Sequence, residues 1–290
     1  MSELFNNEEA KALMLRWFDT FRARLPAGVD SREVSTSFGA THVLVGGPAE
    51  APPLVLLHGA MATSAHALVE LAPLLETFRV YAVDVIGQSV KSADTRLPVR
   101  DDSYGRWLAE VMDGLSLLRA RVVGVSWGGF VTIRLAAVAP QRIEKLALLV
   151  PAGVVTGPMW KGFMQMGWPM TRYVMSPTPE RLRRFVEHLL TTKTDEWVPY
   201  LGDSFRSYSM GKMKVPRLAK ADELKGFTAP TLVMGADEDL SFPGDKVITR
   251  AKELFSGLER TELIEHCKHC PPTTPEFRTW LSEKISSFLQ

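Results

Sequence analysis

The chain has 290 residues, of which 46% are hydrophobic, so it can bury one large α/β core and still carry an insertion. Its 34 Lys and Arg nearly balance its 33 Asp and Glu, which leaves a formal net charge of +1. No overall electric field therefore favours nucleic acid or an acidic membrane as a partner. We expect binding specificity to come from a local site that takes a small molecule.

The first residues predict an amphipathic helix rather than a targeting segment. Charged residues interrupt this stretch, which lacks the apolar run of a signal peptide, and no window approaches the roughly 20 apolar residues of a membrane span. We expect a cytoplasmic protein in which residues 1–28 form a helix packed on the body, with a homodimer interface or a flap over the site as alternatives. Its apolar residues recur at helical spacing: Leu13, Met14, Trp17, Phe18, Phe21 and Leu25.

The rest of the chain alternates between strand-like and helix-like segments. Residues 32–38 and 41–46 predict a hairpin. The following strand segments are apolar throughout, which is typical of a mostly parallel, twisted sheet with helices on both faces. These segments are Pro53–Leu57, Arg79–Val85, Arg121–Val125, Ile143–Val150, Thr231–Ala236 and Thr261–Ile264. Helical patterns lie between them at Ala65–Leu75, Tyr104–Leu117, Gly129–Ala139, Asp245–Phe255 and Pro275–Phe288.

The alternation is interrupted once. From residue 154 to residue 227 the sequence is helical, aromatic and methionine-rich, with no strand pattern. Ligands of open α/β sheets bind outside the carboxyl ends of the strands, where this segment would lie. We interpret it as a helical lid inserted after the sixth strand, between a first core part (29–153) and a second (228–290).

The clearest catalytic motif in the chain has a serine at its centre. Gly124-Val-Ser126-Trp-Gly128 fits the pattern G-x-S-x-G, directly after one predicted strand and directly before a helical run. A sharp strand-to-helix turn holds such a serine in a strained backbone that only small neighbours tolerate. The turn also aims the N–H groups of a helix N-terminus at developing negative charge. Ser126 is the predicted nucleophile.

Acyl transfer by such a serine requires two backbone N–H groups aimed at the carbonyl oxygen as it becomes an anion. Trp127, the residue after the nucleophile, is one predicted donor. The other should lie in the loop after Pro53–Leu57, with Ala60 preferred and Met61 second. His58 precedes the serine and ends a strand, so we interpret it as a residue that shapes this loop.

The acid and the base should follow the serine in that order. Three adjacent carboxylates, those of residues 237–239, come after the strand that follows the insertion. Of six histidines, only His266 and His269 come after these carboxylates and after the last predicted strand. We favour His269, because His266 directly follows the strand and is better explained as packed or exposed.

Two cysteines flank this histidine. Cys267 and Cys270 fit C-x-x-C, but a metal site would need a second pair of ligands, which the sequence lacks. No metal and no cofactor are expected. Two cysteines are also too few for a disulfide framework, and cytosolic thiols are usually reduced. A reversible disulfide beside the histidine is the minor alternative.

With these motifs, the chain resembles the α/β-hydrolase superfamily over nearly its whole length, and within it bacterial carboxylesterases of about 300 residues. The resemblance is carried by 35–45 (STSFGATHVLV), 51–60 (APPLVLLHGA), 81–87 (YAVDVIG), the start of the helix at 104–108, and 124–129 (GVSWGG).

The resemblance implies a Ser–His–Asp or Ser–His–Glu triad, hydrolysis of carboxylic esters and no cofactor. The spacing of Asp239 from Pro230 and Pro243 makes it the preferred acid, ahead of Glu238 and then Asp237. Asp84 and the segment 87–89 occupy a loop that is similar to Asp-x-x-Gly-x-Gly-x-Ser in many relatives, and we interpret them as structural. The chain departs from the usual Ala-Gly-His at the base, where it has Cys267-Lys268-His269.

The first part of the insertion is dense in large apolar residues. Most such residues are ordinary core, but pockets for small acyl or aryl esters have the same lining, and methionine adapts to varied shapes. Met61, Trp160 and Met164 are the predicted substrate contacts. We expect short-to-medium apolar esters to be preferred over charged or long-chain ones.

Several functions on the same fold compete with this prediction. Lactonases and carbon–carbon bond hydrolases use the same triad, and weakly catalytic ligand receptors can retain it. Haloalkane dehalogenases and epoxide hydrolases need an aspartate where residue 126 is serine. A prolyl aminopeptidase would share the Ser-Trp-Gly-Gly elbow but would need carboxylates in the insertion to hold the amine of its substrate. The candidates are Glu180, Glu187, Asp195, Glu196 and Asp203.

Overall fold

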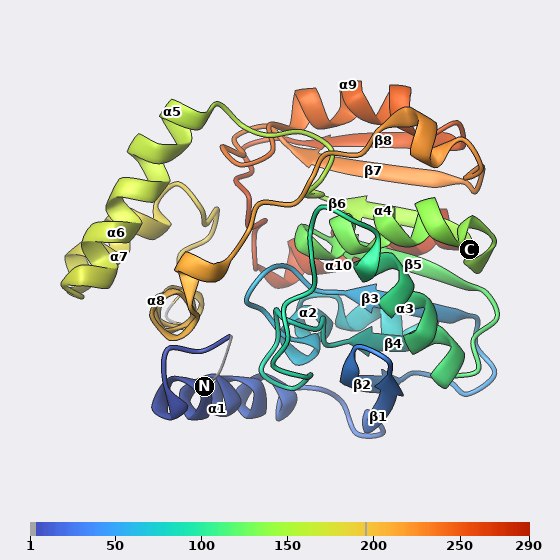
Figure 1. The fold of residues 1–290 in the computed structure, drawn as a ribbon, viewed down its shortest axis with the longest axis horizontal. Helices are drawn as coiled ribbons and strands as arrows, with labels where there is room; N and C mark the ends of the chain where they lie inside the picture. The colour runs from blue at the N-terminus through green and yellow to red at the C-terminus, as the bar shows by residue number, and fades with distance from the viewer. Residues whose placement is uncertain (1–3, 195) are drawn as a thin grey trace.

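The computed structural model describes residues 4–194 and 196–290, and these form one eight-stranded sheet with helices on both faces (Figure 1). The strand order is β1-β2-β4-β3-β5-β6-β7-β8, and β2 alone runs against the others. The strands are β1 Asp30–Thr36, β2 Gly39–Gly46, β3 Pro53–Leu57, β4 Arg79–Val83, β5 Ala120–Val125, β6 Ile143–Leu149, β7 Thr231–Ala236 and β8 Leu258–Ile264. The expected mostly parallel sheet is confirmed, and the predicted hairpin is the β1–β2 pair.

The central strands are buried because helices cover both faces of the sheet. All six residues of β7 and the last four of β3 are buried, whereas the edge strand β1 buries only Val34. One hydrophobic cluster packs the sheet against α3 (Ser103–Gly114), α4 (Trp127–Val138) and α9 (Gly244–Leu254). A second packs the other face against α1 (Glu8–Arg22), α2 (Ser64–Glu70) and α10 (Pro275–Leu289). This arrangement explains the continuously apolar strand segments.

The segment between β6 and β7 forms the insertion, which lies to one side of the sheet (Figure 1). In its described residues it has helices and turns and no strand: α5 Met159–Gly162, a π-helical turn Phe163–Gly167, α6 Trp168–Met175, α7 Pro179–Val186 and α8 Trp197–Ser207. It has a small hydrophobic cluster of its own, made by Tyr173, Phe185, Val186, Leu189, Leu190 and Trp197.

Helix α1 connects the core to the insertion. It lies against α2 of the core and α8 of the insertion (Figure 1). The ring of Phe21, which is fully buried, packs edge-on against His66 of α2 and Tyr200 of α8, with centroid separations of 4.8 and 5.1 Å. Trp17 Nε1 donates to Asp203 Oδ2 at 2.9 Å. Residues 1–3 of the predicted N-terminal segment lie outside the described residues.

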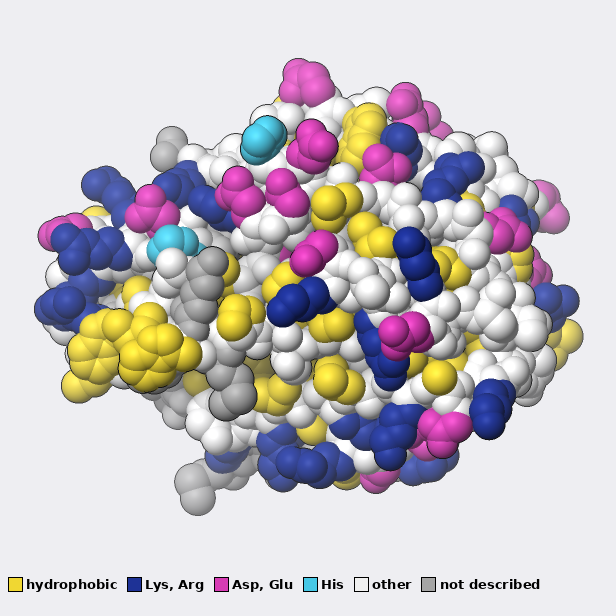
Figure 2. Space-filling view, turned by 90° about the horizontal axis from the view of Figure 1, so that it is seen from above, with side chains coloured by type: hydrophobic (Ala, Val, Ile, Leu, Met, Phe, Trp, Pro, Cys, Tyr) yellow, Lys and Arg dark blue, Asp and Glu magenta, His cyan; other side chains and the backbone are white. Residues whose placement is uncertain are grey.

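The surface carries charges of both signs over most of one face (Figure 2). Hydrophobic side chains gather at the end of this face that the insertion forms, beside a group of Lys and Arg (Figure 2). No helix in the described part of the chain combines the length and apolar character needed to cross a bilayer.

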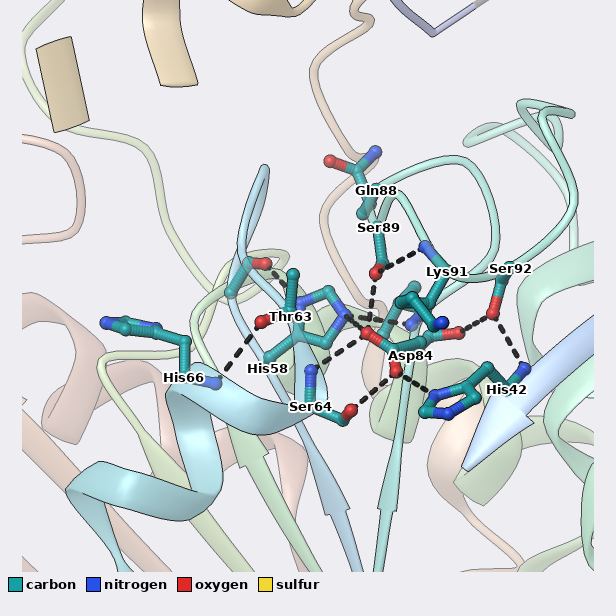
Figure 3. Close-up of polar contacts among 12 residues, drawn as sticks. His42, His58, Thr63, Ser64, His66, Asp84, Gln88, Ser89, Lys91 and Ser92 are labelled. Carbon is teal, nitrogen blue, oxygen red and sulfur yellow. Dashed lines mark hydrogen bonds and ion pairs between the residues drawn. The ribbon is translucent and has the colours of Figure 1, made fainter. Parts of the chain in front are cut away.

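Asp84, directly after β4, is fully buried and holds three elements together (Figure 3). Its carboxylate accepts hydrogen bonds from His42 Nδ1 of β2 at 2.7 Å and from the Ser64 backbone N–H of α2 at 2.9 Å, as well as from the hydroxyls of Ser64 and Ser89. Burial alone would raise the pKa of Asp84, but these hydrogen bonds and the neighbouring histidines outweigh it and lower that pKa. Asp84 therefore stays ionised, consistent with the structural role expected from the sequence.

Replacing Asp84 by Asn should lower the free energy of unfolding by about 3–5 kcal/mol at pH 7, because several buried donors lose their charged acceptor. The depressed pKa of the folded state means that the carboxylate stabilises fully above its unfolded-state pKa of about 3.9 and loses this effect as the pH falls through the folded-state value. Urea unfolding should show a constant difference from wild type between about pH 5 and 8 that narrows only below about pH 4. The exposed Asp113→Asn is the control, expected to change stability by less than about 0.5 kcal/mol. A D84N protein as stable as the control would contradict the assignment.

Replacing Phe21 by Ala should cost about 3–5 kcal/mol of unfolding free energy, because a fully buried ring is removed from between α1, α2 and α8. Leu118→Ala, at a side chain that is 84% exposed, should have almost no effect on stability. Equal stability of the two variants would show that α1 does not support the core.

Candidate active site

Ser126 sits at the bend between β5 and α4 with a backbone that few residues adopt. Its φ is +49° and its ψ is −110°, and its N–H donates to the Leu149 carbonyl at 2.9 Å. The bend is tight enough that a Cβ on Gly128 would lie 2.3 Å from the Leu57 carbonyl oxygen, and one on Gly124 would lie 2.7 Å from Thr132 Oγ1. The glycines on either side of the predicted nucleophile are therefore required by close contact.

The structure brings Ser126, His269 and Asp239 together. Ser126 Oγ lies 3.0 Å from His269 Nε2, and His269 Nδ1 lies 2.8 Å from Asp239 Oδ2. The other oxygen, Asp239 Oδ1, accepts from the backbone N–H groups of Ser241 at 2.7 Å and Phe242 at 3.1 Å. A carboxylate accepts hydrogen bonds only, so Nδ1 carries the proton and Nε2 is left to accept from the serine.

The electrostatics of His269 suit a base. Burial would lower its pKa, but the charge of Asp239 and the hydrogen bond between them outweigh burial and raise the pKa of His269 above its ordinary value of 6.5. The buried carboxylate thus fixes both the orientation of the imidazole and its affinity for a proton. A base of this kind can take the serine proton during attack.

The other candidates for acid and base lie elsewhere. Glu238, Asp237 and His266 are exposed, whereas Asp239 is only 2% exposed. Asp237 accepts from the backbone N–H groups of His266 at 3.0 Å and Cys267 at 2.9 Å, so it orders the turn that leads to His269. The three adjacent carboxylates are therefore not equivalent, although their sequence gave no sign of this second role.

The predicted oxyanion donors lie on either side of Ser126. Trp127 is the first residue of α4, and Ala60 lines the same cavity as the serine. His58 Nδ1 donates to the Gly59 carbonyl at 2.7 Å, and its Nε2 accepts from the Val85 N–H at 2.9 Å. The Gly59 carbonyl and the Ala60 N–H belong to one planar peptide and point in opposite directions, so holding the carbonyl orients the N–H.

His58 is a shaping residue rather than a base. It is buried, and burial lowers its pKa despite the opposing charge of Asp84 and the hydrogen bond to Gly59. Its two ring nitrogens are both occupied by backbone groups. The Met61 N–H donates to Gln88 Oε1 at 3.4 Å, which favours Ala60 over Met61 as the donor from this loop.

Ser126 and His269 open into a cavity of about 650 Å³ whose walls are mostly apolar. The size is within the usual range for small-molecule sites. The core contributes Met61, Leu149 and Phe242 among others, and the insertion contributes residues such as Met166 and Leu201. Met61 is thus placed where the predicted substrate contact requires.

Trp160 and Met164 do not line the cavity, which corrects the prediction that they contact the substrate. Neither belongs to the cavity wall, and their side chains are 75% and 46% exposed. Their helical segment is apolar on more than one side, and among its described side chains Met166 lines the cavity. Apolar periodicity could not indicate which of these sides faces inward.

Residues of the insertion position both loops of the site, and the sequence analysis did not identify them. Tyr200 Oη and Ser204 Oγ of α8 donate to the Met61 carbonyl at 3.3 and 3.1 Å, beside the proposed donor Ala60. Thr191 Oγ1 accepts from the Lys268 N–H at 2.9 Å and donates to the Cys270 carbonyl at 2.8 Å, on either side of His269. A hydroxyl that contacts a distant backbone leaves no signal in a single sequence.

The two cysteines beside His269 do not form a second reactive site or a metal site. Cys267 and Cys270 are free, and burial raises the pKa of Cys267 to about 12 and that of Cys270 further still. Protonated thiols are poor nucleophiles, which disfavours the reversible disulfide. No group of three potential metal ligands comes together within the described part of the chain.

Four of the five carboxylates that an aminopeptidase could use have partners outside the cavity. Those of Glu180, Glu187 and Glu196 pair with Arg184, Lys193 and Arg24, and Asp203 binds Trp17. None of these four lines the cavity, and Asp195 lies outside the described residues. The carboxylate that does line it, that of Glu70, forms a two-pronged ion pair with Arg278 at 2.8 and 2.6 Å.

Known proteins are similar to this chain over nearly its whole length. The uncharacterized carboxylesterase nap of Bacillus subtilis is 26% identical over 287 residues, which cover 94% of this chain and 92% of that protein. The carboxylesterase YbfK of the same organism is 26% identical over 288 residues, which cover 95% and 94%. The crystal structure of carboxylesterase CesB (YbfK) superimposes with a TM-score of 0.80 at 22% identity, covering 97% of this chain and 98% of that one.

The family model of the alpha/beta hydrolase fold matches residues 52–273, which is most of the chain and spans the segments that carry Ser126, Asp239 and His269. The matched region also contains the whole insertion. This chain belongs to the α/β-hydrolase fold family.

Proposed function

We propose that this protein is a serine hydrolase that cleaves small apolar carboxylic esters, with Ser126 as nucleophile, His269 as base and Asp239 as acid. The observation that carries the proposal is the chain of hydrogen bonds from Ser126 Oγ to His269 to Asp239 at the wall of an apolar cavity. The two full-length relatives named carboxylesterases support the same reaction class.

In the first half-reaction, Ser126 Oγ attacks the ester carbonyl carbon while His269 Nε2 takes its proton. The carbonyl oxygen becomes an anion that accepts hydrogen bonds from the Ala60 and Trp127 N–H groups. The intermediate then collapses, the alcohol leaves with the proton from His269, and the acyl group stays on Ser126. Asp239 keeps the imidazole oriented and stabilises its protonated form.

In the second half-reaction, water attacks the acyl carbon and gives a proton to His269. Collapse of this second intermediate breaks the bond to Ser126 Oγ, which recovers the proton from His269. The carboxylic acid leaves, and the site returns to its starting state. The same groups therefore serve both steps, with His269 alternating between base and acid.

The walls of the cavity support apolar substrates. Apart from the polar reacting groups, the ion pair of Glu70 with Arg278 and the exposed Lys214, the side chains around the cavity are mainly apolar or aromatic. A buried ion pair has no net charge to attract an ionic substrate. We propose that the insertion, residues 154–227, acts as a lid whose inner side chains complete this lining. Short-to-medium apolar esters fit it best.

Replacing Ser126 by Ala should abolish turnover of p-nitrophenyl butyrate, with kcat falling on the order of 10⁶-fold, because the nucleophile is lost. A fluorophosphonate probe should label wild type on the peptide that contains Ser126 and should not label the variant. Ser287→Ala, at an exposed serine of α10, is the control and should behave as wild type. Labelling on another residue would overturn the assignment, and a single slow acylation without turnover would favour a ligand receptor.

The pH dependence tests the base and the acid together. Catalysis needs neutral His269, so kcat/KM should fall as the pH drops through the pKa of this residue, with a midpoint above its ordinary value of 6.5. Asp239→Asn removes the charge that raises this pKa, so the midpoint should shift to lower pH and kcat should fall on the order of 10⁴-fold. Glu238→Gln, at the adjacent exposed carboxylate, should keep both the pH midpoint and the kcat of wild type. A larger loss in E238Q than in D239N would mean that the acid is misassigned.

A further inference from the structure

The insertion exposes large hydrophobic side chains along one side of its first helical segment, Met159–Met175. Trp160, Met164, Trp168 and Met175 are 75%, 46%, 50% and 81% exposed. They recur at intervals of four, four and seven residues, which places them on one face of a helix. We call these four residues the outer face. Large apolar patches on the surface of a soluble protein usually mark an interaction site.

The side of the segment opposite the outer face packs against the rest of the protein. The same segment points Met166 at the catalytic cavity, where Ser241 Oγ contacts its Sδ at 3.8 Å, and it packs Met170 and Tyr173 into the hydrophobic cluster of the insertion. One segment therefore has an inner side that lines the cavity and packs into the insertion, and an outer side that exposes large hydrophobic surface. Burying two exposed tryptophans against a partner would be favourable.

The charge around the outer face is strongly positive. Residues 159–186 contain five basic residues and one acidic residue: Lys161, Arg172, Arg181, Arg183, Arg184 and Glu180. Arg172, Arg183 and Arg184 are exposed. Figure 2 shows Lys and Arg beside the hydrophobic patch at the end of the molecule that the insertion forms. The balanced net charge of the whole chain, +1, conceals this local excess.

We propose that the outer face of the insertion binds a lipid surface that carries anionic headgroups, with Trp160 and Trp168 at the level of the headgroups and the exposed arginines paired with phosphate. Helical segments that bind at an interface combine bulky apolar residues with Lys and Arg in this way. Tryptophan suits the boundary because its ring is apolar and its N–H is polar. A second copy of the chain fits less well, because self-association would bring two positively charged segments together.

Such binding would bring the segment that lines the catalytic cavity to a place where apolar esters concentrate. It would act through partitioning of the substrate and would add no step to the chemistry at Ser126. The proposal goes beyond ester hydrolysis and does not depend on it. It also differs from the expectation from net charge that no membrane surface is a partner, since the total charge of the chain does not describe the charge of this segment.

The test is binding of the full chain to vesicles of phosphatidylcholine with and without phosphatidylglycerol, measured by co-sedimentation and by the blue shift of tryptophan fluorescence. Wild type should bind the anionic vesicles, and raising the salt concentration should weaken this binding. Trp160→Ser/Trp168→Ser should reduce the affinity at least about tenfold. Arg172→Gln/Arg183→Gln should reduce it by about fivefold for each arginine removed.

Matched controls separate this surface from the rest of the protein. Leu118→Ser changes a side chain that is 84% exposed on the core, and Lys246→Gln/Lys252→Gln removes two exposed cations from α9. Both should bind anionic vesicles as wild type does. All variants should keep the thermal unfolding midpoint of wild type and its turnover of p-nitrophenyl butyrate in solution, so a loss of vesicle binding cannot be confused with a loss of the fold or of the proposed activity.

Two results would overturn the proposal. The first is vesicle binding that does not depend on the outer face: either wild type does not bind anionic vesicles, or the W160S/W168S variant binds them as tightly as wild type does. The other is that light scattering finds a dimer of wild type that the same variant dissociates, which would make the outer face an interface between two copies.

Discussion

The geometry of the site depends on the backbone of one residue, Ser126, at the end of β5. A positive φ is costly for a side chain with a Cβ, and here it persists because the N-terminus of α4 packs directly onto β3 through Gly128. That contact fixes the direction of α4 and exposes the serine hydroxyl above the sheet. The parallel order of β3, β5, β6, β7 and β8 then brings three further loops to the same edge. The proposed donors, acid and base all lie in loops at this edge, so the sheet order allows residues far apart in sequence to meet within hydrogen-bond distance.

The insertion lines the cavity and also forms hydrogen bonds to the loops of the site. Hydroxyls of α8 hold the carbonyl of Met61, whose φ of +54° places it in a turn that few residues adopt. Thr191 spans the backbone on both sides of His269. The oxyanion loop and the base loop are thus both tied to the same 154–227 segment. A movement of this segment would disturb the donors and the base together, and α1, packed between α2 and α8, limits such movement. If the insertion acts as the proposed lid, its position and the alignment of the site would depend on the same hydrogen bonds.

The parts that the sequence predicted well are those fixed by local chemistry. The bend at Ser126 needs glycines at set spacing, and buried parallel strands need continuous apolar runs, so both leave strong local patterns. Asp239 and His269 needed the order of acid and base along the chain, and for the acid also a family resemblance. The roles of Asp237, Thr191 and Tyr200 were not predictable, because each acts on backbone groups that only the tertiary structure brings near. Trp160 and Met164 were misplaced because a helix that is apolar on more than one side does not indicate which side faces inward.

The net charge of the whole chain does not describe the charge of the insertion. The insertion between 154 and 227 has twelve Lys and Arg against seven Asp and Glu, so the rest of the chain carries the opposite excess. Fields at a surface depend on charges within about a Debye length, roughly 8 Å at physiological salt, rather than on the total for the molecule. A patch with two exposed tryptophans and several arginines therefore meets its surroundings as a cationic, apolar surface even though the chain as a whole is almost neutral. This local excess is a property that the net charge of the whole chain cannot show.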